Sequence, residues 1–218
     1  MTLRITTHSG WSFCSLAISL LCAGCQPKLE PIVSDLNETF ERGEIGPAWR
    51  DSGGKYRIVQ GELSTQAAHH HPIWLQRRMP TDVSLEFDVR TPSPNGDIRV
   101  ILFGDGKSAN PDAEGCQSSG YELVFGGWKN QLSVICRAGQ VDGGHQRARS
   151  DWPVVPERTY HFYITRKDGV LSWYIDGHEM MSWSDSKPLM GTGHEAFAFD
   201  GGQSPIFFDN LVIGPYHI

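Results

Sequence analysis

Five side chains between residues 97 and 137 are candidates for binding a carbohydrate: Asp97, Arg99, Tyr121, Trp128 and Arg137. If residues 97–103 form a strand, Asp97 and Arg99 project from one face of it, and the apolar residues between and after them project from the other. Aromatic rings can stack on the C–H groups of a sugar, and charged groups can fix its hydroxyls or a uronate. The alternative is a surface ion pair, with Trp128 packed over the end of a hairpin.

Two histidine-containing stretches could carry metal or acid–base chemistry. In residues 69–71, His-His-His, successive side chains of an extended segment point to opposite faces, so at most two could bind one ion. The alternative is a polar loop before Pro72. His194 stands beside Glu195 in a glycine-rich loop, where the pair could transfer a proton or only order the loop through a hydrogen bond.

Asp209 is a candidate oxygen ligand for a structural Ca²⁺. With Asn210 it precedes the end of the chain, and Glu38 or Glu41 could supply further oxygens if the two chain ends meet. The alternative is an Asx hydrogen bond at the start of a strand. The sequence indicates no other cofactor.

The first residues are typical of an export signal rather than of the fold. Residues 13–23 form an unbroken run of apolar or small residues, too short for a bilayer, which takes about 20 residues. Ala23-Gly24-Cys25 resembles the end of a bacterial lipoprotein signal, although Cys22 stands where Leu is preferred. The alternative is an ordinary secretory signal.

The lipoprotein resemblance implies three segments. Residues 1–24 are a signal peptide, 25–37 are a lipidated Cys25 with a tether, and 38–218 are one folded domain. It also implies a location in the bacterial cell envelope, with Gln26 favouring the outer membrane if the cell has two. The lipid is the expected membrane contact.

The charge balance argues against a nucleic-acid partner. Removal of residues 1–24 takes away only Arg4, and the remaining chain has 18 basic against 25 acidic residues. Phosphate binding calls for a clustered basic surface. The pair Arg147 and Arg149, near Arg137, is better explained as a solvated loop.

Cys116 and Cys136 could form a disulfide in an oxidising compartment. A hairpin around residues 127–130 would set Cys136 opposite Tyr121, which lies about 17 Å from Cys116 along an extended chain. A disulfide allows roughly 4.4–6.8 Å between Cα atoms. Residues 115–120 would have to fold back, so a disulfide and two separate thiols both stay open.

The elements that must position these residues are short strands. With 24 glycines, 13 prolines and few charged residues, the composition excludes a helical bundle. Residues 83–89 alternate apolar and polar, which predicts a strand with one buried face. Asp-Gly turns follow residues 167 and 175 and predict hairpins. Further strands are expected at 56–59, 73–76, 97–103, 121–125, 132–137, 160–166, 170–175, 196–199 and 206–213.

Three stretches together resemble the concanavalin A-like lectin and glucanase superfamily: 38–63 with Trp49 and a Gly-x-Leu turn, 166–185 with its Asp-Gly hairpin, and the final strand at 206–213. The resemblance implies an all-β, antiparallel, two-sheet jelly-roll sandwich in one domain. This fold hosts enzymes and binding modules alike, so it does not select a function.

Two enzyme families of this fold offer comparisons. Family-sixteen glycoside hydrolases carry Glu-x-Asp-x-x-Glu on one strand; Glu86 and Asp88 match its first two acids, but Thr91 stands where the third belongs. The expected role of Glu86 and Asp88 is therefore a solvated strand face. The general layout also resembles the 3-keto-disaccharide hydrolases, without assigning catalytic residues.

The sequence thus favours a lipid-anchored module that binds a glycan or another envelope component without catalysis. The alternatives are a glycan-processing enzyme (a glycoside hydrolase, a 3-keto-disaccharide hydrolase or a polysaccharide lyase) and a purely structural envelope protein. Hydrolysis would be favoured by Glu86 or Asp97 lying within about 10 Å of Glu122 or Glu195 in a pocket.

Replacing Cys25 tests the anchor. Cys25→Ser removes the thiol that would carry the lipid, so we expect the protein to appear in the soluble or the unprocessed fraction. Cell fractionation and the mass of the processed chain measure this. Unchanged membrane retention with normal processing would refute lipidation.

Overall fold

The structure, a computed structural model, describes residues 29–112, 115–138 and 145–217. The expected signal and Cys25 lie outside the described residues. Among the described residues, no helix is long and apolar enough to cross a membrane.

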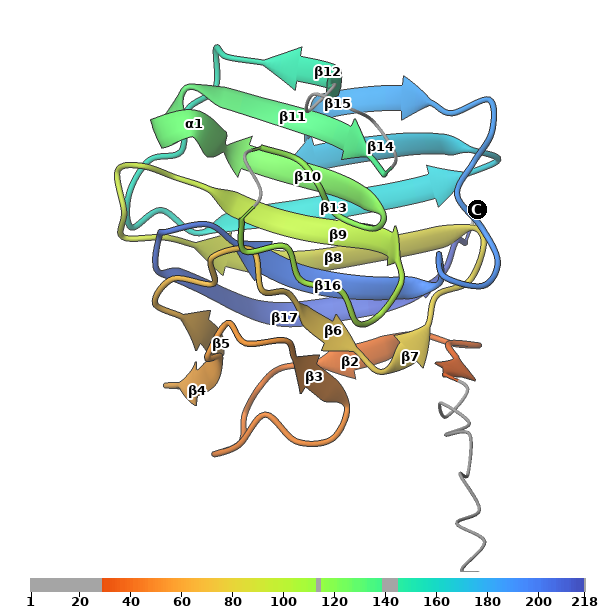
Figure 1. The fold of residues 1–218 in the computed structure, drawn as a ribbon, viewed down its shortest axis with the longest axis horizontal. Coiled ribbons are helices and arrows are strands. Elements are labelled where there is room, and N and C mark those ends of the chain that lie inside the picture. Colours follow the sequence, from red (N-terminus) through yellow and green to blue (C-terminus); the bar gives the residue numbers. More distant parts are fainter. Residues whose placement is uncertain (1–28, 113–114, 139–144, 218) are drawn as a thin grey trace, which may run out of the picture.

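Two antiparallel sheets stack face to face (Figure 1). The nearer one in Figure 1, called the front sheet below, has the order β12 (His145–Arg149), β11 (Leu132–Arg137), β10 (Tyr121–Gly126), β9 (Ile98–Gly104), β16 (Ala196–Gly201), β6 (Ile73–Leu75), β3 (Trp49–Asp51). The back sheet has the order β15 (His178–Ser184), β14 (Val170–Ile175), β13 (Tyr160–Lys167), β8 (Val83–Arg90), β17 (Ile206–Pro215), β5 (Glu62–Thr65), β4 (Arg57–Val59), with β2 (Leu36–Glu38) beside β17. The expected all-β antiparallel sandwich is confirmed.

Two Asp-Gly turns close the hairpins of the back sheet. Asp168 and Gly169 join β13 to β14, and Asp176 and Gly177 join β14 to β15. All four residues have positive φ, between 50° and 78°. Positive φ at both central residues matches the twist of the strands, and Asp-Gly adopts it readily. The predicted hairpins are confirmed.

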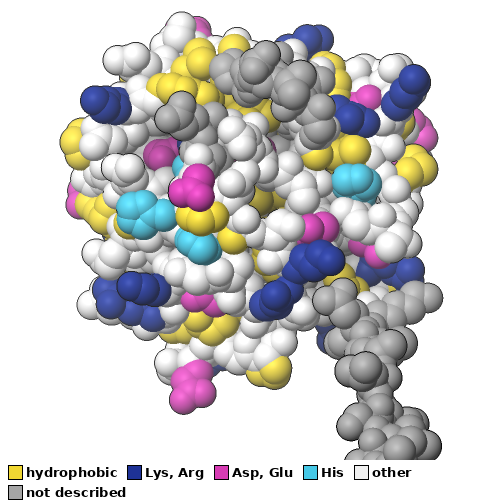
Figure 2. All heavy atoms as spheres, viewed as in Figure 1, with side chains coloured by type: hydrophobic (Ala, Val, Ile, Leu, Met, Phe, Trp, Pro, Cys, Tyr) yellow, Lys and Arg dark blue, Asp and Glu magenta, His cyan; other side chains and the backbone are white. Residues whose placement is uncertain are grey.

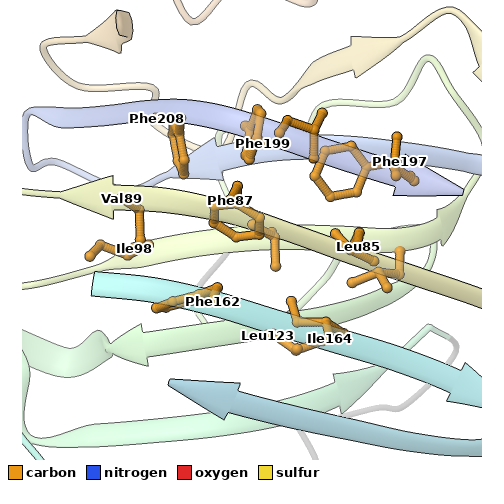
Figure 3. Packing of buried hydrophobic residues seen from close by; sticks show 14 of the residues in the cluster. Leu85, Phe87, Val89, Ile98, Leu123, Phe162, Ile164, Phe197, Phe199 and Phe208 are labelled. Carbon is orange, nitrogen blue, oxygen red and sulfur yellow. The ribbon is translucent and has the colours of Figure 1, made fainter. Parts of the chain in front are cut away.

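An aromatic core fills the space between the sheets (Figure 3). Phe87 of β8 is fully buried and lies 5.1 Å, between ring centroids, from both Phe162 of β13 and Phe199 of β16. Phe199 also stacks on Phe208 of β17 at 4.1 Å. Because residues alternate along β8, its polar residues face away from this core.

The front sheet is also covered on its outer face, the face turned away from the back sheet. Every residue of β9 and β10 is buried, although only alternate residues can face the aromatic core. The connection between these strands, residues 105–120, provides part of the cover: Trp74 of β6 donates its indole N–H to the Ser108 carbonyl at 3.1 Å. Fully buried strands lose the polar–apolar alternation that marks a half-buried strand.

The sheets begin earlier in the chain than the boundary at residue 38. β1 (Glu30–Pro31) pairs in parallel with β7 (Arg77–Arg78), and β2 pairs with β17. Leu29 packs against a small apolar cluster on the outer face of the front sheet, which includes Trp74 and Ile101. Pairing with a strand edge satisfies the backbone groups of these residues, so part of the expected tether belongs to the sandwich.

Some strands were not expected from the sequence. β3, β5, β7 and β12 contain between two and five residues each, and most lie toward the edges of the sheets. Such short segments hold too few residues to show a period of two.

Phe87 tests the core. Phe87→Ala leaves a cavity between three aromatic rings, so we expect a loss of about 3–5 kcal/mol in the free energy of unfolding. Denaturant unfolding measures the loss. Phe207→Ala is the matched control, because Phe207 lies on the outer face of β17. The guanidinium carbon of Arg90 lies over its ring, 4.0 Å from the ring centroid. This control should cost about 1 kcal/mol, and equal losses at both positions would contradict the assigned core.

Candidate functional site

Three charged residues stand together on the outer face of the front sheet. Arg99 of β9 lies directly opposite Asp200 of β16. On the other side of β9, Glu122 of β10 lies opposite Ile101, two residues along from Arg99 and on the same face. Their neighbours on this face are apolar: Ile101 and Val124. A buried charged cluster in an apolar surface calls for specific partners.

Arg99 is the centre of the cluster. Its Nε donates to Asp97 Oδ1 at 2.7 Å, and its Nη1 donates to Glu122 Oε1 at 2.6 Å and to the Gly115 carbonyl at 3.2 Å. Its side chain is only 5% exposed. Burial alone would lower the pKa of Arg99, but Glu122, Asp97 and Asp200 together raise it. Arg99 therefore stays charged and holds two strands and a loop together.

Asp200 is buried beside these charges without a full set of partners. Only 2% of the residue is exposed, and among the described residues no group hydrogen-bonds its Oδ1. Burial and then the charge of Glu122 raise the pKa of Asp200 well above its usual range, while Arg99 opposes them. A buried oxygen without a partner costs free energy unless something else binds there.

His70 lies in a turn beside this cluster, next to Glu122 and Asp200. Its backbone N–H donates to the Gly201 carbonyl at 3.1 Å, and its own carbonyl accepts from the Asn110 N–H at 3.0 Å. These bonds join the end of β16 to the 105–120 connection through a residue with φ of 57°. Burial, followed by the charge of Arg99, lowers the pKa of His70 to about 4, so the imidazole is neutral near pH 7.

His70, Glu122 and Asp200 could hold a metal ion. One nitrogen or oxygen from each residue lies within 4.8 Å of the others. Within residues 29–112, 115–138 and 145–217 this is the only group of three such residues to do so.

The three residues line a small pocket of ≈ 30 Å³. Its other lining residues are Pro72, Trp74, Ile101, Ser108, Ala109, Asn110, Gly115, Gln117, Ser118 and Ser119. A water needs about 10–15 Å³ of such space, so the pocket holds an ion or one or two waters. It does not enclose a sugar ring, but a hydroxyl could enter. Figure 2 looks onto this face; Glu122 and Asp200, each only 2% exposed, lie beneath the surface drawn there.

A disulfide fastens the loop over the pocket. Cys116 and Cys136 are bonded, with 6.1 Å between their Cα atoms. Cys136 pairs with Glu122, not with Tyr121, so the hairpin register is one residue from the expected one. The connection folds back across the sheet, which brings Cys116 to β11 and places the Gly115 carbonyl on Arg99.

The structure divides the five predicted sugar-binding residues. Arg99 projects into the cluster, as its alternation with Ile98 and Val100 predicts. Asp97 precedes β9 with φ of 75° and joins the cluster by accepting a hydrogen bond from Arg99. Trp128 lies in α1 (Gly127–Asn130), is 40% exposed, and has its ring beside Gly115, the loop residue that contacts Arg99.

Tyr121 and Arg137 lie apart from that cluster. Tyr121 donates its hydroxyl to Asp185 Oδ2 at 2.7 Å, and Arg137 Nε donates to the same oxygen at 2.8 Å. The ring of Tyr121 is buried in the core against Trp183. Because Tyr121 adjoins Glu122, the two must face opposite sides of β10. The five residues therefore do not form one platform.

The remaining histidine and carboxylate candidates have local partners. His71 contacts the Ser52 carbonyl and His194 contacts the Phe103 carbonyl, while His69 is exposed. Glu195 lies 3.8 Å from Arg78. Of the histidine tract, only His70 enters the pocket.

Asp209 and Glu38 do not share a site. Asp209 Oδ1 accepts from the Asn210 N–H at 2.7 Å, the expected Asx alternative. Glu38 binds Arg42 and accepts from the Trp49 indole at 3.2 Å. Glu38 is therefore engaged with Arg42 and Trp49, whereas Glu41, the other proposed partner, lies close enough to Asp209 for its charge, in addition to burial, to help raise the pKa of Asp209.

Glu86 and Asp88 lie on the solvated outer face of the back sheet. His161 contacts Asp88 at 3.0 Å and Glu86 at 3.6 Å, and all three side chains are at least 32% exposed. By contrast, Asp97 and Glu122 bond the same guanidinium group, so their carboxylates are less than about 10 Å apart. Convergent acids thus exist, but on the front sheet.

Sequence reasoning missed Asp200 and did not single out His70 within the histidine tract. One feature of the sequence points to Asp200. It directly follows the apolar residues 196–199, so in a continued strand its carboxylate lies on the face opposite Phe199. The tract 69–71 was a metal candidate, but no strand period could show which histidine enters the pocket, because a left-handed turn directs His70.

Comparisons with known proteins agree on the fold. The family described as "Farnesoic acid 0-methyl transferase" matches residues 68–206. No curated protein matches the chain. Among solved structures, the carbohydrate-binding module CBM66 from Bacillus subtilis has a TM-score of 0.58 at 13% identity, covering 77% of this chain and 95% of that one.

A carbohydrate recognition domain and an exoplasmic/lumenal domain are also similar. The first, the carbohydrate recognition domain of Emp46p in a potassium-bound form, has a TM-score of 0.62 at 12% identity, covering 85% of this chain and 98% of that one. The exoplasmic/lumenal domain of VIP36 in a Ca²⁺/Man3GlcNAc-bound form has a TM-score of 0.61 at 12% identity, covering 79% and 85%. At such identities the likeness shows the fold alone, a concanavalin A-like jelly roll, which confirms the expected resemblance.

A double-mutant cycle tests the Arg99–Glu122 pair. Arg99→Met leaves buried carboxylates without their cation, so we expect a loss of about 3–5 kcal/mol in unfolding free energy. Arg99→Met with Glu122→Gln removes one of those charges and should be less destabilising than the two single changes summed. Denaturant unfolding measures all three, and the exposed Arg57→Met serves as the control.

Additive losses in the Arg99–Glu122 cycle would show that the two side chains do not interact. A loss for Arg57→Met equal to that for Arg99→Met would also contradict the assignment, because it would remove any special role of the buried position.

Proposed function

We propose that this chain, which belongs to the family described as farnesoic acid O-methyl transferase, is a glycan-binding sandwich held at a bacterial cell envelope by a lipid on Cys25. The observation that carries glycan binding is the pocket on the outer face of the front sheet, with its polar rim and a neighbouring exposed tryptophan.

The rim offers groups that suit sugar hydroxyls. Ser108, Asn110 and Gln117 come from the 105–120 connection, and Asn110 donates to Gln117 at 3.1 Å. Such hydroxyl and amide groups both donate and accept hydrogen bonds. Trp128 lies beside the same loop and is 40% exposed, and an indole ring can stack on the C–H groups of a sugar.

The small volume suggests how a glycan would bind. At ≈ 30 Å³ the pocket admits one substituent of a sugar, with the ring outside against the rim. Few groups would then contact the ligand, and the affinity of one site would be low. We therefore expect recognition of a terminal sugar, strengthened when several copies bind one surface.

The family description names a methyl transfer, on which this proposal does not rest. Among the described residues the strands pair antiparallel except for the short β1–β7 pair, and the only helix is α1. They contain no βαβ unit, the arrangement that forms nucleotide-binding crevices in doubly wound sheets. The pocket and its rim fit a polyhydroxylated ligand.

Glycan hydrolysis is the second candidate. Glu122 and Asp200 bring oxygens within 4.8 Å, and burial raises the pKa of Asp200 while Arg99 pairs with Glu122. One protonated and one ionised carboxyl group are what retaining hydrolysis uses, at about 5–5.5 Å. Only 2% of each residue is exposed, however, so a glycosidic oxygen would have to enter a pocket that holds one or two waters.

A glycan array with the purified full chain tests glycan binding. We expect binding to a subset of neutral or acidic glycans, and Trp128→Ala should weaken it at least about tenfold through the loss of ring stacking. Tyr174→Ala is the matched control, because Tyr174 lies on the outer face of the back sheet beside Tyr163 and should leave binding unchanged.

Three outcomes of the glycan array would count against the proposal. No binding to any glycan would favour a structural envelope protein. Equal binding by the Trp128→Ala and unchanged proteins would remove Trp128 from the site. Release of reducing sugar ends that depends on Glu122 would favour the hydrolase.

A further inference from the structure

We propose that His70, Glu122 and Asp200 bind one divalent first-row transition-metal ion, with Zn²⁺ as the best fit. The inference does not rest on glycan binding, because it concerns the bottom of the pocket and is tested without a glycan.

The geometry brings three ligand atoms to one point. The residues come from a turn, from β10 and from β16, and their ligand atoms lie within 4.8 Å of one another. Zn²⁺ binds nitrogen and carboxylate oxygen at about 2.0–2.2 Å, so in its tetrahedral geometry two ligand atoms lie about 3.3–3.6 Å apart. Side-chain movements of about 1 Å would close the site, which leaves a fourth position toward the pocket.

A second observation is independent of this spacing. Asp200 is 98% buried, lines the pocket, and has an Oδ1 without a hydrogen-bond partner among the described residues. Such an oxygen is expensive to bury unless a cation or a donor meets it. Glu122 uses Oε1 for Arg99, which leaves its other oxygen for an ion.

The charges of the cluster also match a divalent ion. Arg99 supplies one positive charge against the carboxylates of Asp97, Glu122 and Asp200. When all three are ionised, two negative charges are left over, which equals the charge that one divalent cation neutralises.

The donor set selects the kind of metal. Ca²⁺ prefers six to eight oxygen ligands, whereas this site offers one imidazole and two carboxylates in ≈ 30 Å³. An imidazole with carboxylates suits Zn²⁺, and three protein ligands with an open position are a common Zn²⁺ arrangement. A water or a hydroxyl in the pocket would occupy that position.

Metal binding to the full chain tests the inference. The purified protein is freed of metal with a chelator and titrated with ZnCl₂, MnCl₂ and CaCl₂ by calorimetry, and native mass spectrometry counts the ions. We expect one Zn²⁺ per chain at saturation of the tightest site, bound more tightly than Ca²⁺. His70→Ala and Asp200→Asn should each weaken Zn²⁺ binding at least about 100-fold, since each removes a direct ligand.

Two matched controls isolate the site. His69→Ala removes the exposed neighbour of His70, and Asp209→Asn removes a carboxylate outside the pocket; both should bind Zn²⁺ as the unchanged protein does. Asp200→Asn nearly preserves shape, and circular dichroism with thermal unfolding in chelator checks that each variant folds. If His70→Ala does not fold, Asp200→Asn and the visible spectrum of the Co²⁺-loaded protein decide.

The inference would be overturned by any of three results: no Zn²⁺ bound, Ca²⁺ bound more tightly than Zn²⁺, or equal Zn²⁺ affinity in the unchanged and Asp200→Asn proteins. None of these depends on the glycan array. The two experiments together therefore distinguish a protein that binds glycans but no metal from one that binds a metal but no glycan.

Discussion

The buried guanidinium of Arg99 is the interaction on which the front sheet depends. It reaches Asp97 before β9, Glu122 on β10 and the Gly115 carbonyl in the loop, so one side chain joins a strand start, a neighbouring strand and the cover. A charge in this position costs free energy by itself, and its bonds offset that cost. Glu122 and Asp200, which lie beside Arg99, also line the pocket.

The cover over this face explains why the site is small. The described part of the 105–120 loop is held near its start by the Trp74 indole on the Ser108 carbonyl and near its end by the disulfide from Cys116. A concave sheet without such a loop would present its strands to a large ligand. Here the loop reduces that surface to a narrow opening, which suits an ion or one substituent of a sugar better than an extended chain.

Where one face of a strand meets solvent, the fold could be read from the sequence. Residues 83–89 alternate because one face of β8 is solvated, and Asp-Gly marks turns because few other pairs accept positive φ. Only part of the site could be predicted in this way. Arg99 could be placed by alternation. Because β10 is buried on both faces, its sequence does not show which of Tyr121 and Glu122 faces the space between the sheets. His70 and the disulfide depend on the path of loops, which a periodic pattern does not encode.

The packing of Leu29 sets how far the pocket could stand from a bilayer. Leu29 rests on the cluster that contains Trp74 and Ile101, and both of those residues also line the pocket. Only four peptide units separate Cys25 from Leu29, a reach of about 14 Å when fully extended. A lipid on Cys25 would therefore keep this face close to the lipid headgroups, and a ligand would have to come to the membrane surface, because the domain could not extend outward to meet it.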